Sequence, residues 1–273
     1  MDFKLKTTLL MMGLIFSSFY KKDLVVSAYE RSIEFSGYEW EVRNNEILEN
    51  PGPNYFSDSS DNVWVDSSGR LHLKLTYRDG KWYGAEVINK EVLGYGKYTF
   101  HLDAKLDQLD SNVVLGLFTY DTESTDAQKK AYREIDIEFA EWGNVNYPNS
   151  QYTIWHSEDK KKSHTYNIYM PHGTWSTHSF DWQPKRIDFE SSGGHHKKTP
   201  DDDFIWQSWS YKNKRVPNEG FAKIHMNLWL FDGQPPKNNQ EVEVIISEFT
   251  FEPLTMKKKI KDTLRNIFSI IGF

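Results

Sequence analysis

Apolar and polar residues alternate with a period of two along several short segments, and this alternation predicts β-strands. The clearest segments are 69–77, 98–102, 133–139, 241–246 and 248–251. Clusters of Gly, Pro, Asn, Asp and Ser separate them, as is typical of turns. No long helical period and no linker interrupts residues 29–253. We therefore expect one all-β domain, an antiparallel sandwich, with a polar loop over residues 191–203.

The N-terminal segment has a different pattern. Two lysines precede an uncharged apolar stretch over residues 7–20, and small residues follow up to Ala28. This order is typical of a secretory signal peptide. We expect residues 1–28 to direct export, which places the protein in the periplasm, at the cell surface or in the medium. An uncleaved anchor is the alternative, because three charged residues at 21–23 separate the apolar stretch from the cleavage site.

The C-terminal segment, residues 254–273, is basic and amphipathic. Apolar residues recur at helical spacing from Met256 to Phe273, and five basic residues crowd the first half of this stretch. The spacing predicts an amphipathic helix. Such a helix can lie on an anionic membrane surface. Alternatively, its apolar stripe packs on the sandwich or on a second copy of the chain.

Composition and charge narrow the function classes. The chain has 273 residues, 38% of them hydrophobic, which suits one large domain with a real core. It has no cysteine, which excludes disulfides, a thiol nucleophile and cysteine-ligated zinc. A net charge of −6 argues against a nucleic-acid partner. Aromatic residues make up 15% of the chain, and such rings serve both sugar binding and β cores.

The segment 133–139 carries the most legible chemistry. On a strand, its three apolar residues share one face and Glu134, Asp136 and Glu138 share the other. Neighbouring carboxylates repel one another, which pushes their pKa values apart and leaves one protonated near neutral pH. Glycoside hydrolysis needs this combination of an acid and a carboxylate. The alternative is the polar face of an exposed strand, although such faces usually mix in Lys and Thr.

The sequence Glu134-Ile135-Asp136-Ile137-Glu138 resembles the catalytic strand of glycoside hydrolase family 16. Four further segments are similar to lichenases of that family, in the same order: 93–98, 117–120, 180–184 and 226–229. The resemblance covers roughly residues 40–253. It implies a concanavalin A-like jelly roll with a concave sheet and an open cleft. It also implies a retaining mechanism, with Glu134 as nucleophile, Glu138 as acid/base and Asp136 as their helper.

The resemblance also suggests residues that bind substrate. Glu86 falls where lichenases keep a sugar-binding Glu, and four residues resemble cleft groups: Phe118, Tyr120, Asn227 and Trp229. Three positions depart from the lichenase pattern. Tyr132 replaces a Trp, Trp155 replaces a Tyr, and Ile88 replaces an Arg. These departures leave the chemistry intact and put lichenan specificity in doubt.

The resemblance requires no organic cofactor. It allows a structural calcium near Gly69 and Glu248, although Glu248 stands where Asp is usual. His195 and His196 are adjacent in a Gly-rich segment and are not expected to converge on a metal.

These features together predict an exported retaining endo-β-glycanase that hydrolyses O-glycosidic bonds of a β-linked polysaccharide, with a β-glucan as the favoured substrate. The short form of the catalytic strand is typical of lichenases and of xyloglucan-active and cell-wall transglycosylating members. A transglycosylase on the same fold is therefore the first alternative. A non-catalytic carbohydrate-binding sandwich is the second, and the sequence leaves the oligomeric state open.

Overall fold

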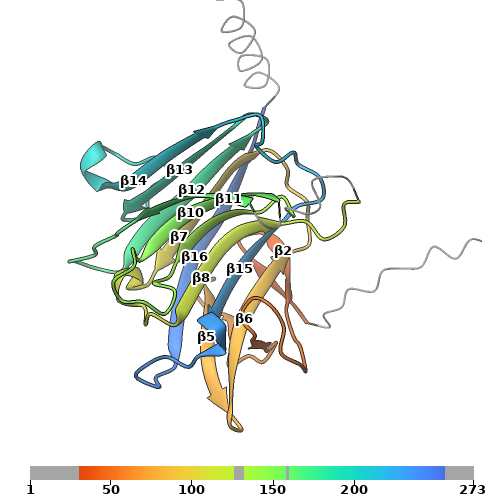
Figure 1. The fold of residues 1–273 in the computed structure, drawn as a ribbon, viewed down its shortest axis with the longest axis vertical. Helices are drawn as coiled ribbons and strands as arrows, with labels where there is room; N and C mark the ends of the chain where they lie inside the picture. The colour runs from red at the N-terminus through yellow and green to blue at the C-terminus, as the bar shows by residue number, and fades with distance from the viewer. Residues whose placement is uncertain (1–30, 126–131, 158–159, 256–273) are drawn as a thin grey trace, which may run out of the picture.

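The computed structural model describes residues 31–125, 132–157 and 160–255. Within these ranges the regular secondary structure is almost entirely β-strand (Figure 1), which confirms the all-β prediction. Short 3₁₀ helices lie at Leu106–Gln108, Asp202–Phe204 and Phe231–Gly233. The predicted signal segment and nearly all of the predicted C-terminal helix lie outside the described residues. In the described ranges, no helix is both long and apolar enough to cross a membrane.

One layer of strands, which we call the cleft sheet, carries the candidate site. Its strands are β1 (Ser32–Phe35), β2 (Tyr38–Val42), β6 (Lys81–Asn89), β8 (Val113–Tyr120), β9 (Ile135–Phe139), β10 (Ser150–Ser157), β11 (Lys160–Tyr166) and β15 (Lys223–Leu230). Their spatial order is β11, β10, β9, β8, β15, β6, β2, β1, and all these neighbours are antiparallel.

The second layer, which we call the outer sheet, covers the other side of the core. Its strands are β4 (Val63–Val65), β5 (Leu71–Arg78), β7 (Gly96–Asp103), β12 (Trp175–Gln183), β13 (Arg186–Gly193), β14 (Ile205–Lys212) and β16 (Val242–Pro253). Their order is β4, β5, β16, β7, β12, β13, β14. The two layers join where β5 pairs with β6, and the short β3 (Tyr55–Phe56) pairs with β6 in parallel. The predicted sandwich is therefore continuous along one edge.

Alternate residues of both layers meet in one hydrophobic core. Val87 and Leu117 enter it from the cleft sheet, and Phe100, Phe180 and Phe249 enter it from the outer sheet, each at most 1% exposed. Burial of one such side chain contributes about 1.5–3 kcal/mol. Part of the high aromatic content is thus core packing.

The core also fixes the orientation of β9. Its apolar residues Ile135, Ile137 and Phe139 are fully buried in the core, as the alternation predicts. Because side chains alternate along a strand, the carboxylates between them must point away from the core.

The predicted strand positions hold, with shifted ends. The segments 241–246 and 248–251 belong to one strand, β16, rather than two. The pairing of β16 with β7 shifts register between Ile246 and Glu248, a β-bulge. The bulge breaks the alternation of side chains, which is why the sequence pattern predicts two strands.

The prediction of a loop over residues 191–203 is wrong at its start. Ser191 and Ser192 lie in β13 and are fully buried. The Ser191 hydroxyl lies within hydrogen-bond distance of Tyr152 Oη at 2.8 Å, Tyr166 Oη at 3.0 Å and His178 Nδ1 at 2.8 Å. Small polar residues normally indicate a loop, and here partners distant in sequence satisfy them inside the protein.

Candidate active site

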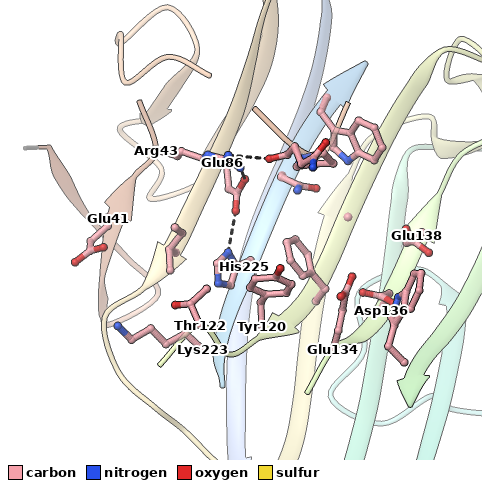
Figure 2. Close-up of a pocket in the computed structure, with 18 of the residues that line it drawn as sticks. Glu41, Arg43, Glu86, Tyr120, Thr122, Glu134, Asp136, Glu138, Lys223 and His225 are labelled. Carbon is pink, nitrogen blue, oxygen red and sulfur yellow. Dashed lines mark hydrogen bonds and ion pairs between the residues drawn. The ribbon is translucent and has the colours of Figure 1, made fainter. Parts of the chain in front are cut away.

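A cleft of about 1260 Å³ runs across the cleft sheet on the side away from the core (Figure 2). Residues of β6, β15, β8, β9 and β10 form its floor. Figure 2 shows Glu41 and Arg43 on one side of the cleft and Asp136 and Glu138 on the other. Pockets for small molecules usually measure about 300–1,000 Å³, so this open cleft has room for a segment of a polymer.

The three carboxylates of the predicted catalytic strand all line this cleft. Asp136 and Glu138 lie on β9, and Glu134 directly precedes it. The main-chain carbonyl of Glu134 accepts a hydrogen bond from the Trp155 amide at 3.1 Å. Glu134 therefore continues the strand geometry, and the three side chains share one face.

Neighbouring strands hold the carboxyl group of Glu138. Gln151 Nε2 donates to Glu138 Oε2 at 2.6 Å, and Thr153 Oγ1 lies 3.3 Å from the same oxygen. Thr153 also contacts the Ser163 hydroxyl at 3.1 Å. These bonds orient the carboxyl group, as a positioned proton donor requires.

Burial raises the pKa values of all three carboxyl groups, and repulsion from neighbouring carboxylates adds to the rise for Glu134 and Asp136. Asp136 is only 3% exposed, and burial and then the charges of Glu134 and Glu138 raise its pKa well above the usual range. Burial, followed by the Glu138 charge, raises the pKa of Glu134, while burial alone raises that of Glu138. The group therefore holds at least one proton near neutral pH, which a general acid needs.

Two residues beside the carboxylates oppose this rise. A hydrogen bond from Trp155 lowers the pKa of Asp136, and the positive charge of Lys161 lowers the pKa values of all three carboxyls. Lys161 Nζ lies 4.8 Å from the centroid of the Trp155 ring, within the range of a cation–π contact. Trp155 on β10 and Lys161 on β11 are direct cross-strand partners.

Aromatic residues of β8 extend the cleft beside Glu134. Phe118 and Tyr120 line it, with ring centroids 6.3 Å apart in an edge contact. Tyr132 does not line the cleft; its ring stacks on Tyr120 at 4.6 Å and 11°. Tyr132 thus supports a cleft residue rather than forming the surface.

The approach to Glu134 has an unusual backbone fixed by a buried ion pair. Tyr132 and Arg133 have φ values of 48° and 51°, a left-handed conformation that is uncommon for such residues. Arg133 is 1% exposed and its Nη1 lies 2.7 Å from the buried Asp121 carboxylate. Asp121 also accepts hydrogen bonds from the amides of Ser124 and Phe221, both at 2.9 Å.

Arg133 leaves no room beside it. Its Nε donates to Asn218 Oδ1 at 2.6 Å. A Cβ atom at Gly220, whose φ is +50°, would collide with the Arg133 guanidinium. The ion pair therefore ties residues 121–124 and 218–221 to the start of the catalytic strand.

Glu86 lines the cleft but is only 3% exposed, and other side chains of the protein bind its carboxylate. Arg43 Nη1 lies 2.8 Å from Oε2, and His225 Nδ1 lies 2.8 Å from Oε1 (Figure 2). Burial acts to raise the pKa of Glu86, but His225 and Arg43 together hold it below the usual range. Glu86 thus anchors two cleft residues. Ile88 and Arg43 both line the cleft, so Arg43 brings a guanidinium to this part of it, and the Arg43 amide donates to the Glu86 carbonyl.

Asn227 and Trp229 line the part of the cleft near β15. Trp229 is 9% exposed and packs against the partly buried Trp142, with ring centroids 6.1 Å apart. Gly116 pairs with both Asn227 and Glu138. A Cβ atom at Gly116 would lie 2.5 Å from Asn227 Oδ1, so glycine keeps this part of the floor open.

Sequence reasoning missed several cleft residues. His225 lies two residues before Asn227, and Gln151 and Thr153 lie four and two residues before Trp155, so each shares a strand face with a predicted cleft residue. The two-residue period of a strand could therefore have identified all three. Arg43 and Lys161 carry no such signal, because their places depend on which strands become neighbours.

The remaining predicted sites lie on the outer sheet. Gly69 is in the turn before β5, and the Glu248 carboxylate lies 3.0 Å from His101 Nδ1. One calcium ligand would therefore already have a partner. In the described part of the chain, no group of three or more His, Cys, Asp or Glu side chains is arranged for a metal. The calcium site stays a prediction. His195 Nε2 and His196 Nε2 contact the carbonyls of Leu102 and Gly193 instead of converging.

Several solved structures share this fold. A β-glucanase of Bacillus licheniformis has 21% identity and a TM-score of 0.56, over 80% of this chain and 94% of that chain. A β-1,3-glucanase from Mycobacterium marinum has 16% identity and a TM-score of 0.59, over 83% and 100%. A Mycobacterium tuberculosis protein described as an immunostimulatory antigen and pseudo β-1,3-glucanase has 19% identity and a TM-score of 0.55, over 76% and 88%.

The sequence itself gives no such match. No protein-family model matches it, and a search of curated proteins finds none that does. At identities of 15–21% the structural likeness establishes the fold, which is that of jelly-roll β-glucanases and similar glycosyl hydrolases.

Proposed function

We propose that this protein is a retaining endo-β-glycanase of the glycoside hydrolase family 16 type, acting on a β-glucan. The observation that carries the proposal is the set of Glu134, Asp136 and Glu138 on one face of the floor of a polymer-sized cleft. The names of the similar structures, several of them β-1,3- and β-1,3-1,4-glucanases, support a β-glucan as substrate.

The mechanism assigns one role to each carboxyl group. The ionised Glu134 attacks the anomeric carbon and forms a glycosyl ester, while Glu138 gives its proton to the departing glycosidic oxygen. Glu138 then takes a proton from a water molecule, which attacks the same carbon and releases Glu134. Bonds from Gln151 and Thr153 hold Glu138 in place for both proton transfers.

Asp136 lies between the two catalytic groups and is the most enclosed of the three. A hydrogen bond with Asp136 lowers the pKa of Glu134. We assign a shared proton to Asp136 at the moment of attack, where Asp136 donates to Glu134 and opposes the rise in its pKa, so that the attacking carboxylate is ionised. Lys161 supplies positive charge on the same side.

Export and a polysaccharide partner belong to the same proposal. Residues 1–28 would carry the protein to where such polymers occur, and the cleft needs no organic cofactor for this chemistry. Cell fractionation with antibody detection tests the export step. Recovery of the unprocessed chain in the cytoplasm alone would contradict it.

The purified protein is tested on a panel of soluble β-glucans, xyloglucan and β-mannan, with measurement of reducing ends and product lengths. We expect internal cleavage of one β-glucan class and no turnover by Glu134→Gln, which is nearly isosteric and removes the attacking charge. Azide should restore turnover to Glu134→Ala and give an inverted glycosyl azide. Glu241→Gln on the outer sheet serves as the matched control.

The same panel separates the two alternatives. Longer products in the presence of oligosaccharide acceptors would identify a transglycosylase, in which a sugar hydroxyl replaces water. Binding without turnover would identify a carbohydrate-binding sandwich, and one protein of similar fold is described as a pseudo β-1,3-glucanase. Full activity of the Glu134 variants would refute the mechanism.

A further inference from the structure

The outer sheet carries a row of residues that crosses five strands on the side away from both the core and the cleft. Trp64 pairs with His72, His72 with Ile245, Ile245 with Asp103, and Asp103 with Trp175. We call these five residues the outer-face strip. Four strand spacings of about 4.8 Å separate its two tryptophans by roughly 19 Å.

Trp175 forms a rigid aromatic platform at one end of the strip. Its side chain is 60% exposed, and its ring stacks on His195 at 5.0 Å and 13°. His195 in turn stacks on His101 at 5.1 Å and 20°. The carbonyl of Leu102 contacts His195 Nε2 at 2.8 Å, and Glu248 contacts His101 Nδ1 at 3.0 Å. These contacts fix the plane of the indole ring before any ligand arrives.

Trp64 forms a second platform at the other end. Its ring stacks on His72 with centroids 4.5 Å apart and 16° between the planes. Glu243 contacts His72 Nδ1 at 2.6 Å, and Asp66 contacts Nε2 at 3.2 Å. Each end of the strip thus has an indole ring backed by an imidazole whose orientation is set by hydrogen bonds.

Charged groups lie beside Ile245, the apolar residue at the centre of the strip. Asp103 is partly exposed and pairs with Arg70 Nη1 at 3.4 Å, while Arg70 is 36% exposed and also pairs with Asp66. Aromatic faces bind the C–H faces of sugar rings, and nearby charged groups bind their hydroxyls. A strip with aromatic rings at both ends and hydrogen-bonding groups between them matches an extended glycan chain.

We infer that the outer-face strip is a second carbohydrate-binding site, which holds several units of a β-linked polysaccharide outside the cleft. The ligand class rests on the proposed function. The length of the strip favours a chain over a monosaccharide, because both platforms are used only when several sugar units span them. The strip would keep the protein on an insoluble polymer while the cleft acts on another segment.

Binding to insoluble β-1,3-glucan and insoluble mixed-linkage β-glucan by the full-length protein tests this inference. The Glu134→Gln background prevents consumption of the polymer. We expect Trp175→Ala and Trp64→Ala each to weaken binding about fivefold, and the double variant more strongly. Tyr77→Ala, at an aromatic residue that is 54% exposed at the far end of β5, should leave binding unchanged. Thermal unfolding confirms that each variant is folded, and Trp175→Phe should retain most of the binding.

Each outcome decides the matter. Unchanged binding by the double variant, or no binding by the unsubstituted protein, overturns the inference. A change in molar mass by light scattering with unchanged glucan binding would make the strip a contact between copies, which also overturns it. Hydrolysis of a soluble oligosaccharide is measured with Glu134 intact and should not respond to the strip variants. If the parent protein does not hydrolyse the oligosaccharide, the proposed function is refuted. The inference about the outer-face strip is then judged by the binding assay alone.

Discussion

Replacing Glu134 by Gln removes one charge from the crowded cleft with almost no change in shape. Burial and the Glu138 charge raise the pKa of Glu134 to about 8, whereas a Glu in an unfolded chain titrates near ~4.3. The folded protein therefore binds this proton more tightly than the unfolded chain does. This tighter proton binding adds to the free energy of unfolding. The contribution is complete below the unfolded pKa and is lost as the pH rises through the folded pKa.

The size of the effect follows from that interval. Each pH unit above the unfolded pKa lowers the free energy of unfolding by about 1.4 kcal/mol, so the ceiling at pH 7 is roughly 3.7 kcal/mol. Glu134 shares protons with Asp136 and Glu138, so its own ionisation accounts for only part of this fall in the free energy of unfolding. We expect Glu134→Gln to be more stable than the parent by about 2 kcal/mol at pH 7, or about 4–8 °C in Tm.

Urea unfolding at pH 4.5 and pH 7 measures this difference. The gain should shrink to roughly 0.5 kcal/mol at pH 4.5, because that pH lies only about 0.2 units above the unfolded pKa. Glu241→Gln provides a control of opposite sign, because a hydrogen bond from Lys74 holds the pKa of Glu241 below its usual range. That variant should lose stability at pH 7. A gain for Glu134→Gln that is absent at pH 7, or equal at both pH values, would refute the reasoning.

Five further predictions concern the cleft, the tail and the metal. Asp136→Asn should leave the basic limb of the pH–rate profile unchanged, because burial and not the charge of Asp136 raises the pKa of Glu138. Lys161→Met should move it to higher pH, and Lys161→Arg should not. Gly116→Val should lower kcat/KM at least about tenfold, because its side chain would fill the cleft floor and displace Asn227. Truncation after Leu254 should leave activity on soluble glucan unchanged and, if the tail binds membranes, abolish sedimentation with anionic liposomes. A structural calcium predicts that chelation lowers Tm and that Glu248→Gln removes this response; equal Tm values with and without chelator would contradict it.

The sequence was most informative where local alternation and burial agree. Alternation in 133–139 predicts which face of β9 is buried, because Ile135 and Ile137 have only one way to reach a core. It fails where hydrogen bonding replaces hydrophobicity. Ser191 is polar in sequence but lies fully buried, with partners on β10, β11 and β12. No local pattern encodes partners so distant along the chain.

The cleft shows the same division. Residues two apart on one strand share a face, so the prediction of Asn227 as a cleft residue also indicates His225. Contacts between strands do not follow from spacing, since Arg43 reaches Glu86 only because β2 lies beside β6. Arg43 and His225 each bind one carboxylate oxygen of Glu86, and each oxygen keeps a further lone pair for a sugar hydroxyl, so sugar binding by Glu86 stays a prediction.

The buried Asp121–Arg133 pair constrains how this protein can change over generations. Removal of one member of a buried ion pair typically costs about 3–5 kcal/mol. Any side chain at Gly220 would displace the same guanidinium. Positions 121, 133 and 220 are therefore coupled, because a substitution at any one of them alone destabilises the protein. Descendants of this chain are expected to carry all three residues or to have replaced all three together, and such a replacement would reset the position of the nucleophile.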